Sequence, residues 1–329
     1  TGNAPGNDMR FYYERVEASR NFANKVWNAS RFILMNMEGR EIALPQKADL
    51  SPADRWIMSR CNRVVKEMTE NMDKFELGIA LSKVYDFIWD EFCDWYIELA
   101  KYRMYHADED MAGANATLWT LREVLKQALK LLHPYMPFVS EEIYSKVQPE
   151  EESLMISPWP SYEKSLEDEE AEAILEHYKE IIRGVRNARA EMNVPNSRKA
   201  TVYVVCKDAD LREGLMLLSE SAKMMAAAND FVVKEDKSGI ADDAVSVVVP
   251  DAVVYVPLEE LIDFEQEIER LTKEEMRLSK EIARATGMLS NEKFVSKAPE
   301  AKVQEEKEKL AGYEQMMAQV EERLAQMSR

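Results

Sequence analysis

The sequence has little cysteine, histidine or glycine: three, three and ten residues respectively among 329. Cys61, Cys93 and Cys206 lie far apart and form no C-x-x-C pair, which argues against a zinc module or a disulfide framework. We interpret all three as buried small apolar residues of a protein in a reducing cytoplasm. Scarce glycine, together with 19 methionines, favours helices over turn-rich β structure.

Long apolar runs are also missing. No stretch approaches about 18 consecutive apolar residues, so the sequence predicts no membrane-spanning helix. No basic segment followed by an apolar one opens the chain, so no secretory signal is predicted. Positive charge is in deficit, because 43 Lys and Arg residues stand against 61 Asp and Glu residues, a net charge of −18. This deficit argues against indiscriminate nucleic-acid binding, including DNA, and confines any RNA contact to local patches.

Residues 10–37 predict one long amphipathic helix. Its buried stripe is expected at positions spaced by three, four and seven, namely Val16, Ala23, Val26, Ile33 and Met37. The opposite side carries amide, basic and aromatic side chains that lie close together at about 100° per residue. These are Arg20, Asn21, Asn24, Lys25, Asn28, Arg31 and Phe32.

This polar side suits single-stranded RNA. Asparagine is a mediocre helix former, so three of them on one side of a single helix suggest a role other than holding the helix. Amides can read base edges, Arg and Lys can hold phosphate, and an aromatic ring can stack on a base. A merely solvated polar face is the alternative, because most polar stripes on helices face water.

Four further helices are expected within 1–162, giving a helical bundle. Ser51 and Pro52 should begin the second helix as N-cap and first residue. The third, about 77–106, is apolar over most of its circumference and belongs in the middle of the bundle. Its acidic residues lie on different faces without a nucleophile or a metal-spaced histidine, so we interpret them as solvated or salt-bridged. His133, at a helix end, is interpreted as structural.

Residues 163–257 predict a small α+β domain. An acidic helix is followed by β-branched runs that read as three or four strands. Arg183, Arg186 and Arg189 recur every three residues, and they either touch RNA or offset acidic neighbours, the second being favoured.

Residues 258–329 predict an antiparallel coiled-coil hairpin, because apolar residues alternate at spacings of three and four. Along its first helix a basic stripe lies opposite the apolar seam, and two more lysines follow near the turn. The seven residues are Arg270, Lys273, Arg277, Lys280, Arg284, Lys293 and Lys297. Charged outer positions are common in coiled coils, so a solvated stripe is the alternative.

Several segments resemble one family. TGNAPGNDMRF with VEASRNFANKVWNASRF, then DEFCDWYIELAK, LHPYMPFVSEEIY and LSNEKFVSKAPEAKVQEEKEKL, are similar to valyl-tRNA synthetases over essentially the whole chain. The resemblance implies a mainly α fold: an anticodon-binding bundle at 1–162, a small α+β linker domain at 163–257, and a tRNA-binding coiled-coil arm at 258–329. The chain starts within a recognisable motif, so we interpret it as the C-terminal part of a longer enzyme.

The resemblance also implies a function. Lys25, Asn28, Arg31 and Phe32 are expected to contact the anticodon of valine tRNA, and the arm is expected to rest on the corner of the tRNA. The parent enzyme would join valine to its tRNA with ATP and Mg in a catalytic part whose motifs are absent here. The fragment is therefore expected to be an inactive, cytoplasmic, monomeric tRNA binder with no catalytic residue, no metal site and no cofactor. The alternatives are the same part of another class I synthetase, isoleucine being nearest, or a helical scaffold that dimerises or binds protein through its coiled coil.

Overall fold

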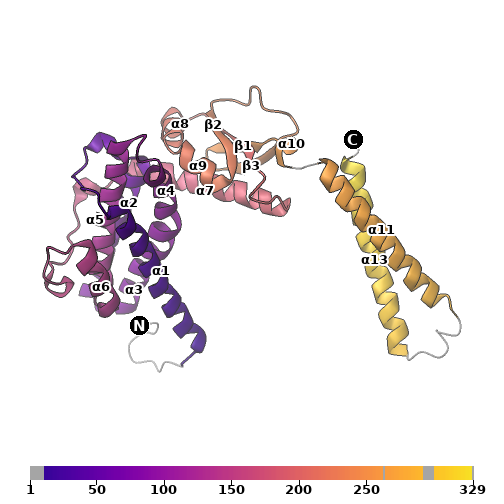
Figure 1. The fold of residues 1–329 in the computed structure, drawn as a ribbon, viewed down its shortest axis with the longest axis horizontal. Helices are drawn as coiled ribbons and strands as arrows, with labels where there is room; N and C mark the ends of the chain where they lie inside the picture. Colours follow the sequence, from indigo (N-terminus) through magenta and orange to yellow (C-terminus); the bar gives the residue numbers. More distant parts are fainter. Residues whose placement is uncertain (1–10, 262–263, 292–299, 328–329) are drawn as a thin grey trace. The chain divides into compact units, whose positions relative to one another are not determined.

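The computed structural model describes residues 11–261, 264–291 and 300–327, and there the chain is mainly helical, as predicted (Figure 1). Two compact units divide between Pro257 and Leu258. The first unit holds α1 (Tyr13–Met37), α2 (Pro52–Asp73), α3 (Leu77–Asp86), the π-helix η2 (Phe87–Tyr96), α4 (Ile97–Tyr105), α5 (Met111–Leu132), α6 (Pro137–Val147), α7 (Glu169–Glu191), β1 (Ala200–Cys206), α8 (Ala209–Met216), α9 (Ser219–Ala226), β2 (Ala228–Lys234), β3 (Val245–Val249) and β4 (Ala252–Val256), with short 3-10 turns η1 (Lys47–Asp49), η3 (Leu154–Ile156) and η4 (Lys164–Leu166). The second holds α10 (Leu258–Leu261), α11 (Phe264–Leu289) and α13 (Glu300–Met327).

The bundle is built from α1 to α6. Helix α2 begins as predicted: Ser51 is the N-cap, Pro52 follows it, and Asp54 closes a capping box with Ser51. The core around α2 is made of large side chains with almost no exposure. These include Trp56, Ile57, Met68, Phe87, Tyr96, Leu121 and Leu129. Their burial supplies most of the driving force for helix packing.

The aromatic-rich segment is one continuous helical run, as expected, but its middle is not an α-helix. Residues Phe87–Tyr96 form a π-helix between α3 and α4. Cys93, Tyr96 and Ala100 are buried, as the periodicity predicts. Phe92 and Trp95 are buried as well, so this run packs over most of its circumference.

The small sheet has four strands in the order β2-β1-β4-β3, with β1 and β2 parallel and the other pairs antiparallel. Alternate residues of β1 and β4 are buried, which is the pattern of a sheet covered on one face. Helix α7 contacts both the sheet and α2, so the α+β part packs against the bundle within the first unit. The proposed boundary between residues 162 and 163 therefore stays a prediction.

The three regularly spaced arginines of α7 all have partners in the protein. Arg183 donates to Glu180 and lies over the ring of Trp95. Arg186 donates to a backbone carbonyl at 2.9 Å, and the buried Arg189 donates to another at 2.9 Å. These contacts favour a structural role for the arginines over contact with RNA.

The second unit is a helical hairpin in which α11 packs along α13 (Figure 1). Leu271, Leu278 and Ala285 are buried on the α11 side, at the seven-residue spacing that the predicted seam requires. Leu310 and Tyr313 are half-buried on the returning helix. At 1.5 Å per residue the 26 residues of α11 reach about 39 Å. Within the described residues, no helix is both long and apolar enough to cross a bilayer.

Candidate nucleic-acid interface

Helix α1 is held to the bundle by its second half. Phe22, Val26, Ala29 and Ile33 are buried, and they form one stripe at helical spacing. The expected stripe was partly wrong: Val16 is 49% exposed, and Ala23 and Met37 are only half-buried. The physical reason is that the first turns of α1 extend beyond the helices it packs on, so all residues from 11 to 21 are exposed (Figure 1).

The polar side of α1 faces solvent, as predicted. Arg20, Asn21, Asn24, Asn28 and Arg31 are all exposed. Arg20 lies 3.8 Å from Glu17, a weak surface pair. The side chains of the other four form no hydrogen bond or ion pair with any residue that the structure describes. Their amide and guanidinium groups are therefore available to a ligand.

Lys25 differs from these residues, because its side chain is already engaged. Its Nζ donates to Asp94 Oδ1 at 2.6 Å and lies 3.8 Å from the centre of the Trp89 ring. Only 21% of the side chain is exposed. The ion pair and the cation–π contact direct the ammonium group toward η2, at the border of the polar face.

Phe32 is half-buried and therefore offers less ring surface than a free stacking side chain. The exposed aromatic side chain of this face is Trp27, at 48% exposure. The sequence analysis did not select it, although the helical angle placed it about 60° from Asn24. A tryptophan is highly buried on average, so residue type alone does not indicate that Trp27 is exposed.

Behind α1 lies a group of stacked aromatic rings. The rings of Phe22 and Tyr85 are 4.4 Å apart, and those of Tyr85 and Trp89 are 5.8 Å apart and nearly parallel. This group fixes α1 on α3 and η2. It therefore positions the whole polar face relative to the bundle.

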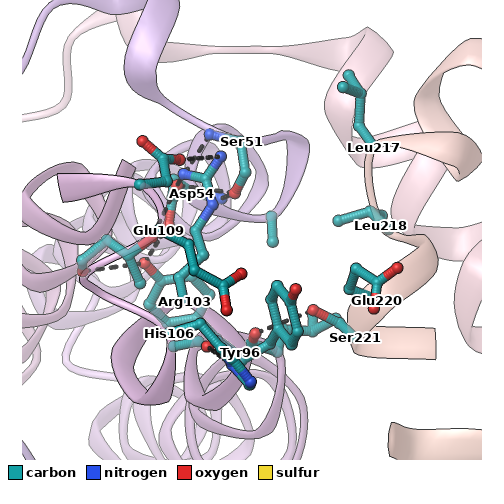
Figure 2. Close-up of a pocket in the computed structure, with 16 residues that line it drawn as sticks. Ser51, Asp54, Tyr96, Arg103, His106, Glu109, Leu217, Leu218, Glu220 and Ser221 are labelled. Carbon is teal, nitrogen blue, oxygen red and sulfur yellow. Dashed lines mark hydrogen bonds and ion pairs between the residues drawn. The ribbon is translucent and has the colours of Figure 1, made fainter. Parts of the chain in front are cut away.

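A cavity of about 330 Å³ lies between the bundle and residues 217–221 of the α+β part (Figure 2). In Figure 2, Arg103 and Glu109 lie on one side of the gap and Leu217 and Leu218 on the other, and Arg103 points toward Asp54, whose Oδ2 is 3.5 Å from Arg103 Nη1.

The floor of this cavity is a structural hub and shows no reactive group. Asp54 is 1% exposed, and its carboxylate accepts from Tyr96 Oη at 2.6 Å and from Ser51 N at 2.8 Å. Ser51 Oγ and Thr117 Oγ1 also donate to it. With its acceptor positions filled, Asp54 holds α2, η2 and α5 together and is not free to act as an acid or base.

The remaining chemical candidates have local partners too. His133 Nδ1 lies 2.8 Å from Ser140 Oγ, which supports its structural interpretation. Glu91 and Glu98 form ion pairs with Arg60 and Lys101, as expected for these acids. Burial raises the pKa of Cys61 to about 12, which suits an inert core residue. Among the described residues, no group of three His, Cys, Asp or Glu side chains is placed to hold a metal ion.

The structure describes the side chains of four of the seven residues predicted to form the basic stripe of the hairpin. Lys273, Arg277, Lys280 and Arg284 are exposed on α11. Three of them pair with a glutamate one turn earlier: Lys273 with Glu269, Arg277 with Glu274 and Arg284 with Glu281. Lys280 has no ion pair within the described ranges. Lys293, Lys297 and the side chain of Arg270 lie outside the described residues.

Two family models of known proteins match separate segments of the chain. Residues 54–204 match the family model of the anticodon-binding domain of tRNA ligases. Residues 263–328 match that of the valyl tRNA synthetase tRNA binding arm. The first match begins after α1, so the polar face lies outside it.

Relatives that align over almost the whole chain also cover the residues of this face. The chain is 49% identical to the valine–tRNA ligase of Clostridium perfringens over 98% of its own length. It is 42% identical to that of Carboxydothermus hydrogenoformans and 40% identical to that of Bacillus subtilis, over 100% and 99% of its length. In each case it spans only 37% of the relative.

Proposed function

We propose that this chain, which belongs to the valyl-tRNA synthetase family, is the part of a valine–tRNA ligase that binds valine tRNA. It spans 37% of the length of the three relatives named above. In this proposal the polar face of α1, namely Arg20, Asn21, Asn24, Lys25, Asn28, Arg31 and Phe32, reads the anticodon. The basic stripe of α11 contacts the corner of the tRNA. The match to a valyl-specific arm disfavours the isoleucine alternative.

The single observation that carries the proposal is the set of unpaired donors on α1. Asn21, Asn24, Asn28 and Arg31 are exposed on one helix face, without partners among the described residues. Directional amides can discriminate bases, whereas the guanidinium group supplies attraction to phosphate. An acidic chain that binds RNA needs such a local site, because its overall charge repels RNA.

The test compares valine tRNA with the same tRNA changed at its middle anticodon base. Asn28→Ala should reduce the preference between the two more than the total affinity, because it removes a directional contact. Phe32→Ala should cost about 1–3 kcal/mol if the ring stacks on a base. Arg31→Gln should weaken binding, and the matched control Arg40→Gln, an exposed arginine beyond the end of α1, should not. No preference by the unmodified chain would contradict the proposal.

The arm is tested separately. Changing Arg277, Lys280 and Arg284 together to glutamine should keep the helix, because glutamine is nearly as good a helix former. It should weaken binding of whole tRNA but not of an anticodon stem-loop, and each lost phosphate contact should flatten the log–log salt slope by up to about one unit. The control triple Lys302, Lys307 and Lys309 to glutamine removes the same charge from α13. Equal binding by both triples would contradict a specific role for α11.

The activity of the parent belongs to the proposal as well. ATP, Mg and valine would bind in a catalytic part outside these residues, in a cytoplasmic enzyme, so the isolated chain should neither exchange pyrophosphate with ATP nor charge tRNA. Valine-dependent exchange by the pure chain would contradict this. The scaffold alternative predicts self-association, whereas we expect a monomer; a mass by light scattering that is independent of concentration decides between them.

A further inference from the structure

Trp27 is a large aromatic side chain beside the amide and basic side chains of the polar face of α1. It is 48% exposed, and its ring takes part in no aromatic stack or hydrogen bond with the residues that the structure describes. Exposing an indole to water costs free energy that a partner ring would recover.

The neighbours of Trp27 on the helix surface carry two other chemistries. Asn24 lies three residues before it and Arg31 four residues after it, and residues at these spacings have Cβ atoms about 5–6 Å apart. Both are exposed, and neither has a partner among the described residues. An aromatic face, an amide and a guanidinium group therefore adjoin one another along the helix.

This group does not coincide with the position expected for the anticodon base at Phe32. Five residues separate Trp27 from Phe32, which corresponds to about 140° around the helix. Phe32 and Lys25 lie on the border that faces η2, as the contact of Lys25 with Trp89 shows. Trp27 lies on the opposite border of the polar face, so one base cannot stack on both rings.

We propose that Trp27 is the platform for a second unpaired nucleobase of the RNA loop, distinct from the base at Phe32. The base stacks on the indole, the amide of Asn24 hydrogen-bonds its edge, and Arg31 holds the adjoining phosphate. The loop therefore spans the width of α1 and is held at both borders. This inference rests on the proposed function and adds to it a binding site for a further base.

The test uses the full chain and an anticodon stem-loop of valine tRNA that carries the fluorescent base 2-aminopurine at one loop position at a time. At one loop position, quenching by the unmodified chain should persist in Phe32→Ala but disappear in Trp27→Ala. Trp27→Ala should raise the Kd about 5- to 150-fold, the loss expected for one stacked base. Trp27→Phe should retain most of the affinity, and Trp27→Leu should lose it, because leucine is apolar but has no π face.

Val16→Ala is the matched control, since Val16 is equally exposed on α1 at 49% but lies more than two turns before Trp27. It should bind as the unmodified chain does. Equal Kd values for Trp27→Ala and the unmodified chain, or full rescue by leucine, would overturn the stacking site while leaving anticodon binding intact. A loss as large in Val16→Ala would overturn it too. Failure of the unmodified chain to bind the stem-loop would overturn both this inference and the proposed function.

Discussion

Lys25 Nζ and Asp94 Oδ1 lie 2.6 Å apart and join α1 to η2 across 69 residues of sequence. The lysine also rests on Trp89, so a carboxylate and an aromatic ring hold the cation at the border of the proposed RNA-binding face. A phosphate approaching Lys25 therefore meets the negative charge of Asp94 as well. Asp94 is 51% exposed on its side chain, so its charge acts directly on a ligand.

Replacing Asp94 should consequently strengthen RNA binding. Asp94→Asn removes the repulsion of phosphate and leaves Lys25 on the Trp89 ring, so the Kd for valine tRNA should fall and the salt dependence should steepen by up to about one unit. The free energy of unfolding should change by less than about 1 kcal/mol, since the pair is partly exposed. Anisotropy titrations at several salt concentrations measure the effect. Asp90→Asn, on the same π-helix, removes equal charge; an identical gain there would show that only net charge matters.

Asp54 should be critical for stability. Asp54→Ala leaves the buried Tyr96 hydroxyl and the Ser51 N–H without their closest acceptor, and it removes the Asp54 half of the capping box of α2. We expect the free energy of unfolding to fall by about 3–5 kcal/mol, as for other broken buried polar networks. Urea unfolding of the full chain measures this, with the fully exposed Asp242→Ala as control. A loss below about 1 kcal/mol for Asp54→Ala would contradict the hub.

His177 should make stability depend on pH. Burial lowers its pKa, but the hydrogen bond to Asp251 and that to the Ala173 carbonyl together raise the pKa above 6.5. Because the folded pKa exceeds the unfolded one, the stabilisation is complete below about pH 6.5 and is lost as pH rises through the folded pKa. Asp251→Asn should remove this part of the pH dependence. The difference in unfolding free energy between the two proteins, measured from about pH 5 to 8.5, should shrink with rising pH; a constant difference would contradict the pair.

Two glycines in helices should respond in opposite directions to alanine. A Cβ at Gly312 meets nothing within 4 Å, whereas one at Gly214 would lie 2.5 Å from the Ile174 side chain. Gly312→Ala should therefore stabilise α13 by up to about 1 kcal/mol, through lower backbone entropy in the unfolded chain. Gly214→Ala should destabilise α8 by about 1–3 kcal/mol because it overpacks the core. Hydrogen exchange resolves both helices, and a change of the same sign at the two sites would refute the packing argument.

Local features of the fold were predictable from sequence. Ser51, Pro52 and Asp54 determine where α2 begins, because a capping box involves only neighbouring residues. The seven-residue spacing of Leu271, Leu278 and Ala285 likewise identified the hairpin seam.

Features that depend on distant partners were not predictable. The engagement of Lys25 depends on Asp94 and Trp89, which periodicity cannot locate. Val16 shares the spacing of the buried residues of α1, but its exposure depends on where the neighbouring helices end. The exposure of Trp27 was not predictable either, because tryptophan is a residue type typical of cores and here lies on the surface.

The π-helix at Phe87–Tyr96 has a consequence for how this fold can change during evolution. An i→i+5 ladder contains one residue more in each hydrogen-bonded ring than an α-helix does. The segment therefore carries a surplus residue in the middle of the bundle, between two ordinary α-helices. Loss of one residue here can be absorbed by converting a π turn into an α turn, so the chain can shorten at its centre while α3 and α4 keep their packing partners.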